Sequence, residues 1–179
     1  QRQMCIRDSI YSTNLGEALS LPHGHYTHAK ARSTGNLWLR HAKQWRRFDL
    51  AASAGISLTP YGTSALWSLS GGYTPAAGLH LGIGAFQSMR LPTFTDLYYT
   101  SPAQINNLDL TPERAVTYLF DAGYMKNSWR LSLQTYYRAG RDIIDWVWRE
   151  DMGDKWHSEQ TSRLDTYGIE LSGGYTCLL

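Results

Sequence analysis

Residues 142–156 hold the densest chemistry in the chain, five carboxylates interleaved with three tryptophans (Asp142, Asp145, Glu150, Asp151 and Asp154, with Trp146, Trp148 and Trp156). Two carboxylates beside aromatic platforms could act as an acid–base pair in glycoside hydrolysis, and acidic oxygens could ligate Ca²⁺. However, the group shares one predicted loop over 139–163, lacks the calcium-loop spacing and has no nucleophile motif nearby. We therefore predict a ligand-contacting or solvated loop, with no catalytic residue and no metal site.

A second chemical candidate is the histidine group His23, His25 and His28, which lies in a polar stretch before the first regular segment. Three clustered histidines could bind a metal or haem. A metal site also needs defined ligand geometry, whereas this segment contains a glycine and no carboxylate or cysteine among the histidines. A solvated loop is expected, no cofactor is predicted, and the role of the three histidines stays open.

Alternation of apolar and polar residues predicts the elements that carry these side chains. Across 48–59 the large apolar residues share one parity and the polar residues share the other, which is the period of a strand with one apolar face. Six further segments alternate in the same way (34–41, 64–74, 78–88, 115–125, 129–138 and 164–176). Nothing reads as a helix of any length. The strands, of roughly 8 to 12 residues, exceed the typical globular length and match the length that spans a bilayer.

Connection length and face polarity together predict a barrel wall. The polar faces carry charges in mid-sheet, at Asp121, Arg130, Arg138 and Glu170, which suits a wet lumen. The long connections 13–33, 89–114 and 139–163 all fall on one rim, and the short ones 42–47, 75–78 and 126–128 fall on the other. Only 60–63 is shorter than its rim would suggest. The prediction is an all-β chain, an antiparallel up-and-down meander of about 7–8 long strands. It would form a partial transmembrane β-barrel, or an open curved sheet as a fragment.

Composition is compatible with this fold. Twelve tyrosines and seven tryptophans stand against four phenylalanines, and Tyr and Trp suit positions that are partly apolar and partly wet. No run approaches the roughly 20 apolar residues of a membrane helix. Basic residues are scattered, so no nucleic-acid partner is predicted. A tyrosine-rich soluble β-sandwich would explain the same composition and stays an alternative.

The two ends of the chain look foreign to the pattern. Residues 1–9 (Gln-Arg-Gln-Met-Cys-Ile-Arg-Asp-Ser) show no strand or helix period and resemble translated sequencing-adapter sequence. Residues 177–179 resemble the opposite adapter end. We expect both segments to be non-native and both cysteines to be accidental. Residues 10–176 are then the partial outer-membrane β-barrel domain.

Four motifs carry a family resemblance. Residues 90–99 read Arg-Leu-Pro-Thr-Phe-Thr-Asp-Leu-Tyr-Tyr, 107–113 read Asn-Leu-Asp-Leu-Thr-Pro-Glu, 142–145 read Asp-Ile-Ile-Asp and 168–171 read Gly-Ile-Glu-Leu. In this order and spacing they resemble the barrel of TonB-dependent outer-membrane receptors, nearest to the vitamin B12 (cobalamin) receptor branch. The matching positions are Arg90, Pro92, Asp96, Leu97, Asn107, Pro112, Glu113, Asp142, Asp145, Gly168 and Glu170. Pro112 is also expected to stop strand pairing.

The resemblance implies active import by a plugged barrel of about 22 strands in the bacterial outer membrane, and not an enzyme. Its partners would be outer-membrane lipid, TonB and a scarce ligand such as cobalamin, a siderophore-iron chelate or haem. The signal peptide, plug and TonB box are expected to lie outside this chain.

The same resemblance selects Tyr98, Tyr99, Trp146 and Trp148 as candidate ligand contacts in outer loops. Tyr98 and Tyr99 could equally anchor at the lipid interface. A non-transporting barrel, such as an adhesin or porin, and a soluble β-sandwich carbohydrate binder remain the alternatives.

Overall fold

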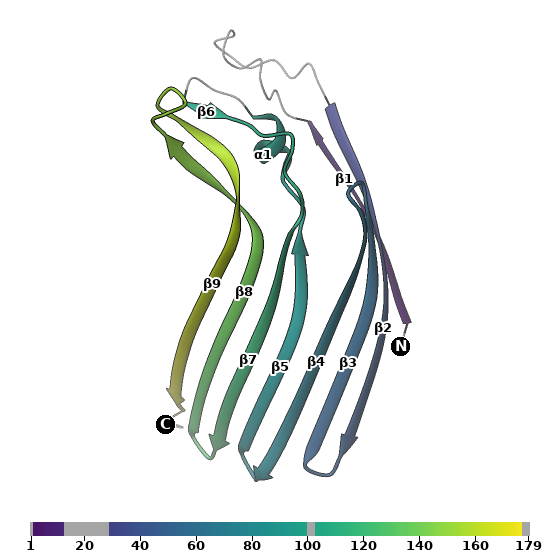
Figure 1. Cartoon of the computed structure of the whole chain (residues 1–179). Coiled ribbons are helices and arrows are strands. Elements are labelled where there is room, and N and C mark those ends of the chain that lie inside the picture. The colour runs from purple at the N-terminus through teal and green to yellow at the C-terminus, as the bar shows by residue number, and fades with distance from the viewer. Residues whose placement is uncertain (1, 13–28, 100–102, 177–179) are drawn as a thin grey trace.

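The computed structural model describes residues 2–12, 29–99 and 103–176. Eight long strands and one short strand form a single nine-stranded sheet that is open and curved (Figure 1). The long strands are β1 Arg2–Ser12, β2 Ala29–Trp45, β3 Phe48–Thr59, β4 Gly62–Ala76, β5 Leu79–Arg90, β7 Glu113–Lys126, β8 Trp129–Arg149 and β9 Lys155–Tyr175. Each pairs antiparallel with the next long strand. The predicted all-β up-and-down meander is therefore confirmed.

The register places most large apolar strand residues on one face. For example, Leu50 pairs with Gly71, which pairs with Ile83, which pairs with Phe120. No second layer covers this apolar face within the described residues, and Ile83 is 65% exposed. The opposite, polar face carries mainly serine, glycine and charged residues, with a few large apolar side chains such as Leu66, Phe86 and Leu119. The alternation thus encodes a sheet with two distinct faces rather than one half of a closed sandwich.

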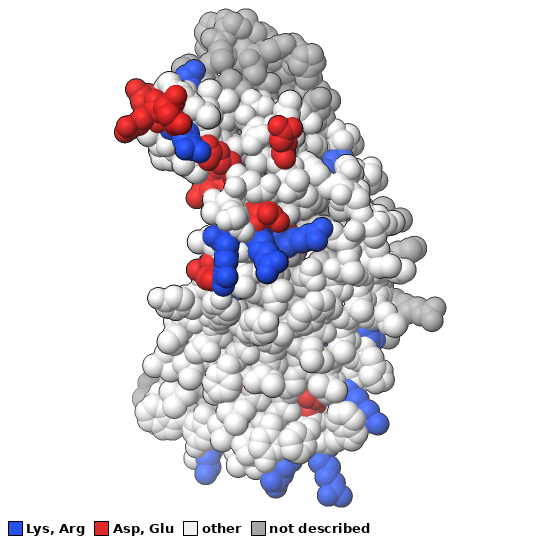
Figure 2. Space-filling view, viewed as in Figure 1, with Lys and Arg blue, Asp and Glu red and all other residues white. Residues whose placement is uncertain are grey.

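The apolar face is bounded by charge at both ends. On β7, Arg114 and Lys126 both fall on this face and lie twelve positions apart, which is about 40 Å along a strand. We call the part of the apolar face between these two levels the apolar band. At the usual barrel tilt of about 35–45°, that distance spans about 30 Å, the thickness of a hydrocarbon core. Figure 2 shows basic side chains in the middle of the molecule, where β7, β8 and β9 pass, and at the short-turn end, with a mainly uncharged area between.

Tight turns join the strands at one rim. The connections at 46–47, 77–78 and 127–128 are two residues long, and Arg46, Gly78 and Asn127 adopt positive φ there. Gly78, with φ +84°, also lies against its neighbour: a Cβ at this position would overlap the Met125 carbonyl. The Met125 N–H donates to the Gly78 carbonyl at 2.7 Å. Gly78 therefore joins two hairpins as well as turning one.

Replacing Gly78 by alanine is expected to lower the free energy of unfolding by at least about 2 kcal/mol, because backbone strain and overlap add. Gly62→Ala is the matched control, since Gly62 also has positive φ (+105°) but no atom within 4 Å of an added Cβ. Urea unfolding in detergent would measure both variants. Equal losses for the two would show that the contact with Met125 is not costly.

The predicted loop over 139–163 is wrong. β8 continues to Arg149 and β9 begins at Lys155, so the connection is only 150–154. Beyond the apolar band both faces meet water, and a strand there needs no apolar–polar alternation to pair. Cross-strand contacts replace it: Trp148 packs edge-on against Trp156, with centroids 5.6 Å apart, and Arg149 holds Glu159 through two hydrogen bonds.

Three smaller expectations also need correction. β2 extends to Trp45, so the predicted turn at 42–47 is only 46–47. A short helix, α1 Phe94–Tyr98, interrupts the long connection where no helix was expected. Residues 2–12 form β1, paired with β2, although they lack a strand period. The proposed foreign origin of residues 1–9 and 177–179 stays a prediction.

Candidate functional site at the long-loop rim

The long connection between β5 and β7 begins with a locally encoded helix. Thr93 caps α1: its hydroxyl accepts the Asp96 N–H at 3.1 Å, and its own N–H donates to the Asp96 carboxylate at 2.8 Å. This reciprocal capping box satisfies N–H groups that a helix start leaves unpaired. The sequence Thr-x-x-Asp after buried Pro92 therefore folds back on itself at the end of β5.

An ionic group ties this helix to the sheet. Arg90 at the end of β5 and Glu113 at the start of β7 are register partners, and their side chains form an ion pair at 2.5 Å. Arg90 also approaches the Asp96 carboxylate at 3.6 Å. The Ile144 N–H of β8 donates to the Glu113 carboxylate at 2.8 Å. We call Arg90, Asp96, Glu113 and Ile144 the anchor cluster, since it joins α1 to three strands.

Within the anchor cluster, Arg90 and Glu113 each stabilise the charged form of the other. Burial raises the pKa of the Glu113 carboxyl, but the hydrogen bonds from Arg90 and Ile144 and the nearby positive charges outweigh it, so that the pKa lies below its ordinary value. The hydrogen bond to Glu113 raises the pKa of Arg90 despite partial burial. Glu113 is only 4% exposed, so it is held as a carboxylate by its partners.

An apolar cluster sits directly beside the anchor cluster. Its buried members come from α1, the connection and β8, with Tyr98 packed against them: Phe94, Leu97, Leu110 and Ile144. Arg32 of β2 adds a long-range clamp, because its guanidinium donates to the Pro92 carbonyl at 2.7 Å and lies 5.1 Å from the Phe94 ring centroid. The connection is thus packed onto the sheet rather than free above it.

The rest of the connection is fixed by polar contacts with α1 and β9. Asn106 donates to the Leu97 carbonyl at 2.6 Å, and the Asn107 N–H donates to the Asp96 carbonyl at 3.2 Å. The short strand β6, Gln104–Ile105, pairs in parallel with Trp156 and His157 of β9. Gln160 of β9 exchanges hydrogen bonds with Thr111.

The family of the chain follows from comparison with known proteins. The model of the family "TonB dependent receptor-like, beta-barrel" matches residues 24–178. The chain belongs to this family. A search of curated proteins gave no significant match.

Solved structures of metal and siderophore receptors or transporters share the fold of this chain. The siderophore receptor PirA from Acinetobacter baumannii superposes with a TM-score of 0.70 at 14% identity, covering 94% of this chain and 30% of that one. The copper transporter OprC gives 0.69 at 15% identity over 83% and 27%. A variant of the ferric enterobactin receptor PfeA from Pseudomonas aeruginosa, in complex with enterobactin, gives 0.69 at 13% over 92% and 29%.

The chain spans less than a third of the length of these receptors. They are siderophore and copper proteins by name, and none supports the cobalamin branch suggested by the motifs. The family assignment therefore stands at the level of the barrel, and ligand choice needs a separate argument.

The structure gathers six of the predicted motif positions of the barrel family around the anchor cluster: Arg90, Pro92, Asp96, Leu97, Asn107 and Glu113. Their contacts are with one another, with the connection, with Arg32 of β2 and with Ile144 of β8. Half-buried Pro112 precedes Glu113, so β7 begins directly after it. These motif residues therefore attach the long connection between β5 and β7 to the end of the sheet. Their side chains make contacts within the protein instead of pointing freely toward a ligand.

The remaining motif positions are not members of the anchor cluster, although Asp145 directly follows Ile144. Asp142 has positive φ and offers its carbonyl to Gln160, while the exposed Asp145 carboxylate accepts the N–H of Trp146. Gly168 pairs with Tyr136, and its Cα lies under that ring. Glu170 pairs with Gln134 on the polar face.

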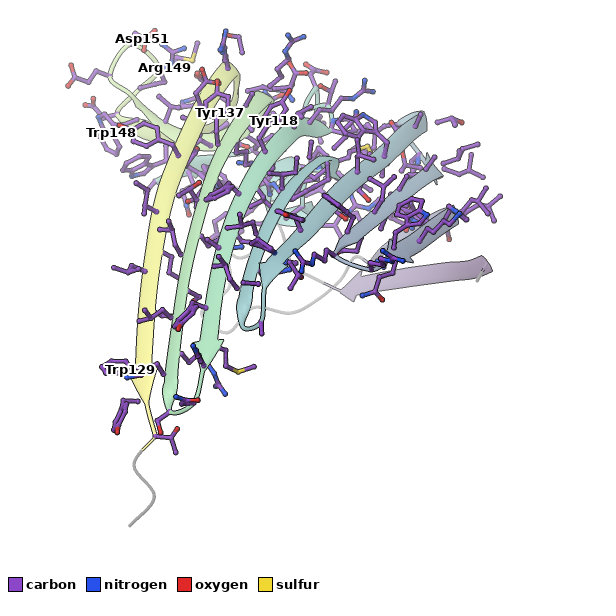
Figure 3. The ribbon with its side chains drawn as sticks, turned by 90° about the horizontal axis from the view of Figure 1, so that it is seen from below. Tyr118, Trp129, Tyr137, Trp148, Arg149 and Asp151 are labelled. Carbon is purple, nitrogen blue, oxygen red and sulfur yellow. The ribbon has the colours of Figure 1, made fainter. Side chains whose placement is uncertain are left out.

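The four aromatic candidates separate into two pairs. Tyr98 and Tyr99 end α1 and are half-buried. Trp146 and Trp148 stand on β8, not in a loop, and Trp148 is 44% exposed. Figure 3 shows Trp148, Arg149 and Asp151 at one end of the strands, with Trp129 at the opposite end. All four candidates lie at the long-loop rim.

Sequence reasoning missed several residues of this rim: Arg32, Gln160 and Glu159 were not singled out for it. The apolar pair Ile143–Ile144 between two aspartates was the available signal that β8 continues. Within residues 2–12, 29–99 and 103–176, no group of three or more metal-binding side chains occurs and no helix is long and apolar enough to cross a membrane. His23, His25 and His28 lie outside the described residues.

Proposed function

We propose that this chain is part of the barrel wall of an outer-membrane receptor that imports a scarce metal-chelate nutrient, with energy supplied through TonB. The observation that carries the proposal is the family match over 24–178. It is joined by the likeness in fold to a siderophore receptor, a copper transporter and a ferric enterobactin receptor. The uncovered apolar face supports the membrane location, since a barrel shows that face to lipid.

We further propose that the long-loop rim contacts the ligand through its aromatic side chains. The anchor cluster holds α1 against the sheet, which places Tyr98 and Tyr99 on a rigid base. The β8–β9 hairpin carries Trp146 and Trp148. Rigid aromatic residues supply contact area at low entropic cost, and such residues dominate binding energy in many interfaces. Iron or copper chelates are favoured here over cobalamin or haem because of the relatives.

The test is uptake and binding by the full-length receptor that carries this sequence. Cells expressing it would be given radiolabelled ferric siderophores, copper and cobalamin, with and without a functional TonB. We expect TonB-dependent uptake of a metal chelate. Uptake of cobalamin alone would move the receptor to the cobalamin branch, and no uptake of any ligand would favour a non-transporting barrel.

The aromatic contacts are tested by single substitutions. Trp148→Ala or Tyr99→Ala is expected to weaken binding of the imported chelate at least tenfold, because loss of an aromatic anchor costs more than about 1.4 kcal/mol. Trp129→Ala is the matched control, since Trp129 is 55% exposed at the opposite end of β8 (Figure 3). Equal affinities in all variants would place ligand recognition elsewhere in the receptor.

A further inference from the structure

Three arginines form a row across the apolar face, at the end of the apolar band that lies nearest the long connections. The register pairs Arg114 of β7 with Arg141 of β8, and Arg141 with Arg163 of β9. Arg163 is neutralised by Asp165 at 2.7 Å. Within the part of the chain that the structure describes, Arg114 and Arg141 form neither an ion pair nor a side-chain hydrogen bond. Like charges placed opposite one another across strands are destabilising. A bound anion would therefore stabilise this pair of arginines.

A hollow lies beside these arginines. Its volume is about 470 Å³, and its lining includes Arg114 and Arg141 with Gln87 and Tyr118. The floor of the hollow is lined by two small side chains, Val116 and Ala139, which are register partners next to the arginines. The hollow therefore offers two guanidinium groups and an amide on the face that carries the apolar band.

A row of tyrosines follows immediately on the band side of the hollow. Tyr118, Tyr137 and Tyr167 are neighbours across the same three strands, and the rings of Tyr118 and Tyr137 are stacked with centroids 6.3 Å apart. Figure 3 shows these two side by side on adjacent strands. Tyrosines of this kind occupy the level of lipid headgroups, with apolar surface below them. A ligand in the hollow would thus have its charged part at Arg114 and Arg141 and its apolar part along the band.

We propose that Arg114, Arg141, Gln87 and Tyr118 form a binding site for the phosphate-bearing headgroup of an outer-leaflet lipid, of the phosphorylated glycolipid class. The guanidinium groups match phosphate oxygens in geometry and charge, and the Gln87 amide suits a sugar hydroxyl. The acyl chains would lie against the apolar band. A free phosphate would satisfy the arginines but would make no use of the band, so the lipid is the favoured ligand. The inference rests on the proposed outer-membrane location.

The test compares lipid binding by the full-length receptor in a zwitterionic detergent. Native mass spectrometry would measure the affinity for diphosphoryl lipid A and for the same lipid after removal of both phosphates. We expect the phosphorylated lipid to bind more tightly, and the double variant R114Q/R141Q to bind it about thirtyfold more weakly, since each basic residue near an anionic surface contributes about fivefold.

The matched control removes two arginines from the other face. Arg40 and Arg130 are exposed and lie on the polar face by register, so R40Q/R130Q should bind lipid A like the unmodified receptor. Heat-modifiable migration in gels would verify that each variant is folded. Should the double variant not fold, the comparison of the two lipids on the unmodified receptor still decides.

Equal affinity for the two lipids would overturn the proposal, as would unchanged binding by R114Q/R141Q. Binding of inorganic phosphate, seen by ³¹P line broadening and not displaced by lipid A, would show an anion site without a lipid and would overturn it too. Failure of the location itself would appear separately, as recovery of the receptor in the soluble fraction without detergent.

Discussion

Replacing Glu113 by alanine is expected to lower the free energy of unfolding by about 2–3 kcal/mol. The change strips Arg90 of its ion-pair partner and leaves the buried Ile144 N–H without an acceptor. Loss of a buried charged partner costs about 3–5 kcal/mol, and the partial exposure of Arg90, 46% in its side chain, reduces this. Urea unfolding of the full-length receptor in detergent measures the loss.

The pH dependence of the same stability has a definite sign. Because the folded pKa of Glu113 lies below its ordinary value, the unfolded chain binds the proton more readily. Its contribution is fully present above the unfolded pKa and is lost as the pH falls through the folded pKa. Glu113→Gln keeps an acceptor for Ile144 but cannot titrate, so its stability should change less across this acidic range.

Asp145→Ala is the matched control for Glu113→Ala, because Asp145 is an exposed carboxylate that accepts only the neighbouring Trp146 N–H. It should change the free energy of unfolding by less than about 0.5 kcal/mol. A loss after Glu113→Ala that is no larger than this would mean that the anchor cluster does not hold the rim together.

Substituting Ile83 by arginine is expected to destabilise the receptor in a bilayer by about 2–4 kcal/mol. Ile83 is 65% exposed within the apolar band of β5, and a basic side chain at that depth faces hydrocarbon. In a soluble protein the same change at an exposed site would be almost neutral and would improve solubility. The sign of the effect therefore distinguishes a lipid-facing band from an uncovered soluble face. Unfolding of the protein reconstituted in phospholipid vesicles gives the measurement.

Two companion variants isolate the charge from the change of shape. Ile83→Leu keeps the face apolar and should cost less than about 1.5 kcal/mol. Ser70→Arg places the same charge on the polar face of β4, at an exposed position whose register partner, Gly84, has no side chain. It should be tolerated better than Ile83→Arg. Similar losses for the two arginines would contradict the assignment of the two faces.

Periodicity was sufficient for most of the fold. Alternation over 48–59 correctly predicted β3 to the residue, and the alternation of long and short connections correctly predicted which rim each belongs to. Alternation failed beyond the band, where β8 and β9 extend through 143–161 with Ile143 paired to Thr161. Those residues pair because the strands are already held in register by their earlier residues. Local alternation of apolar and polar residues does not reveal such a contact with a partner strand.

Side-chain alternation is a local property that decides which face each residue takes, so the sequence alone predicts a two-faced, all-β sheet. It also pointed to the motif residues around Arg90 and Glu113. The contacts of those residues follow from the pairing of distant strands. The same pairing brings Arg114, Arg141 and Arg163 into one row, although they are far apart in the chain. The reason is strand register: a slip of a single residue would move each arginine to the opposite face. Pairing over the whole sheet selects the register.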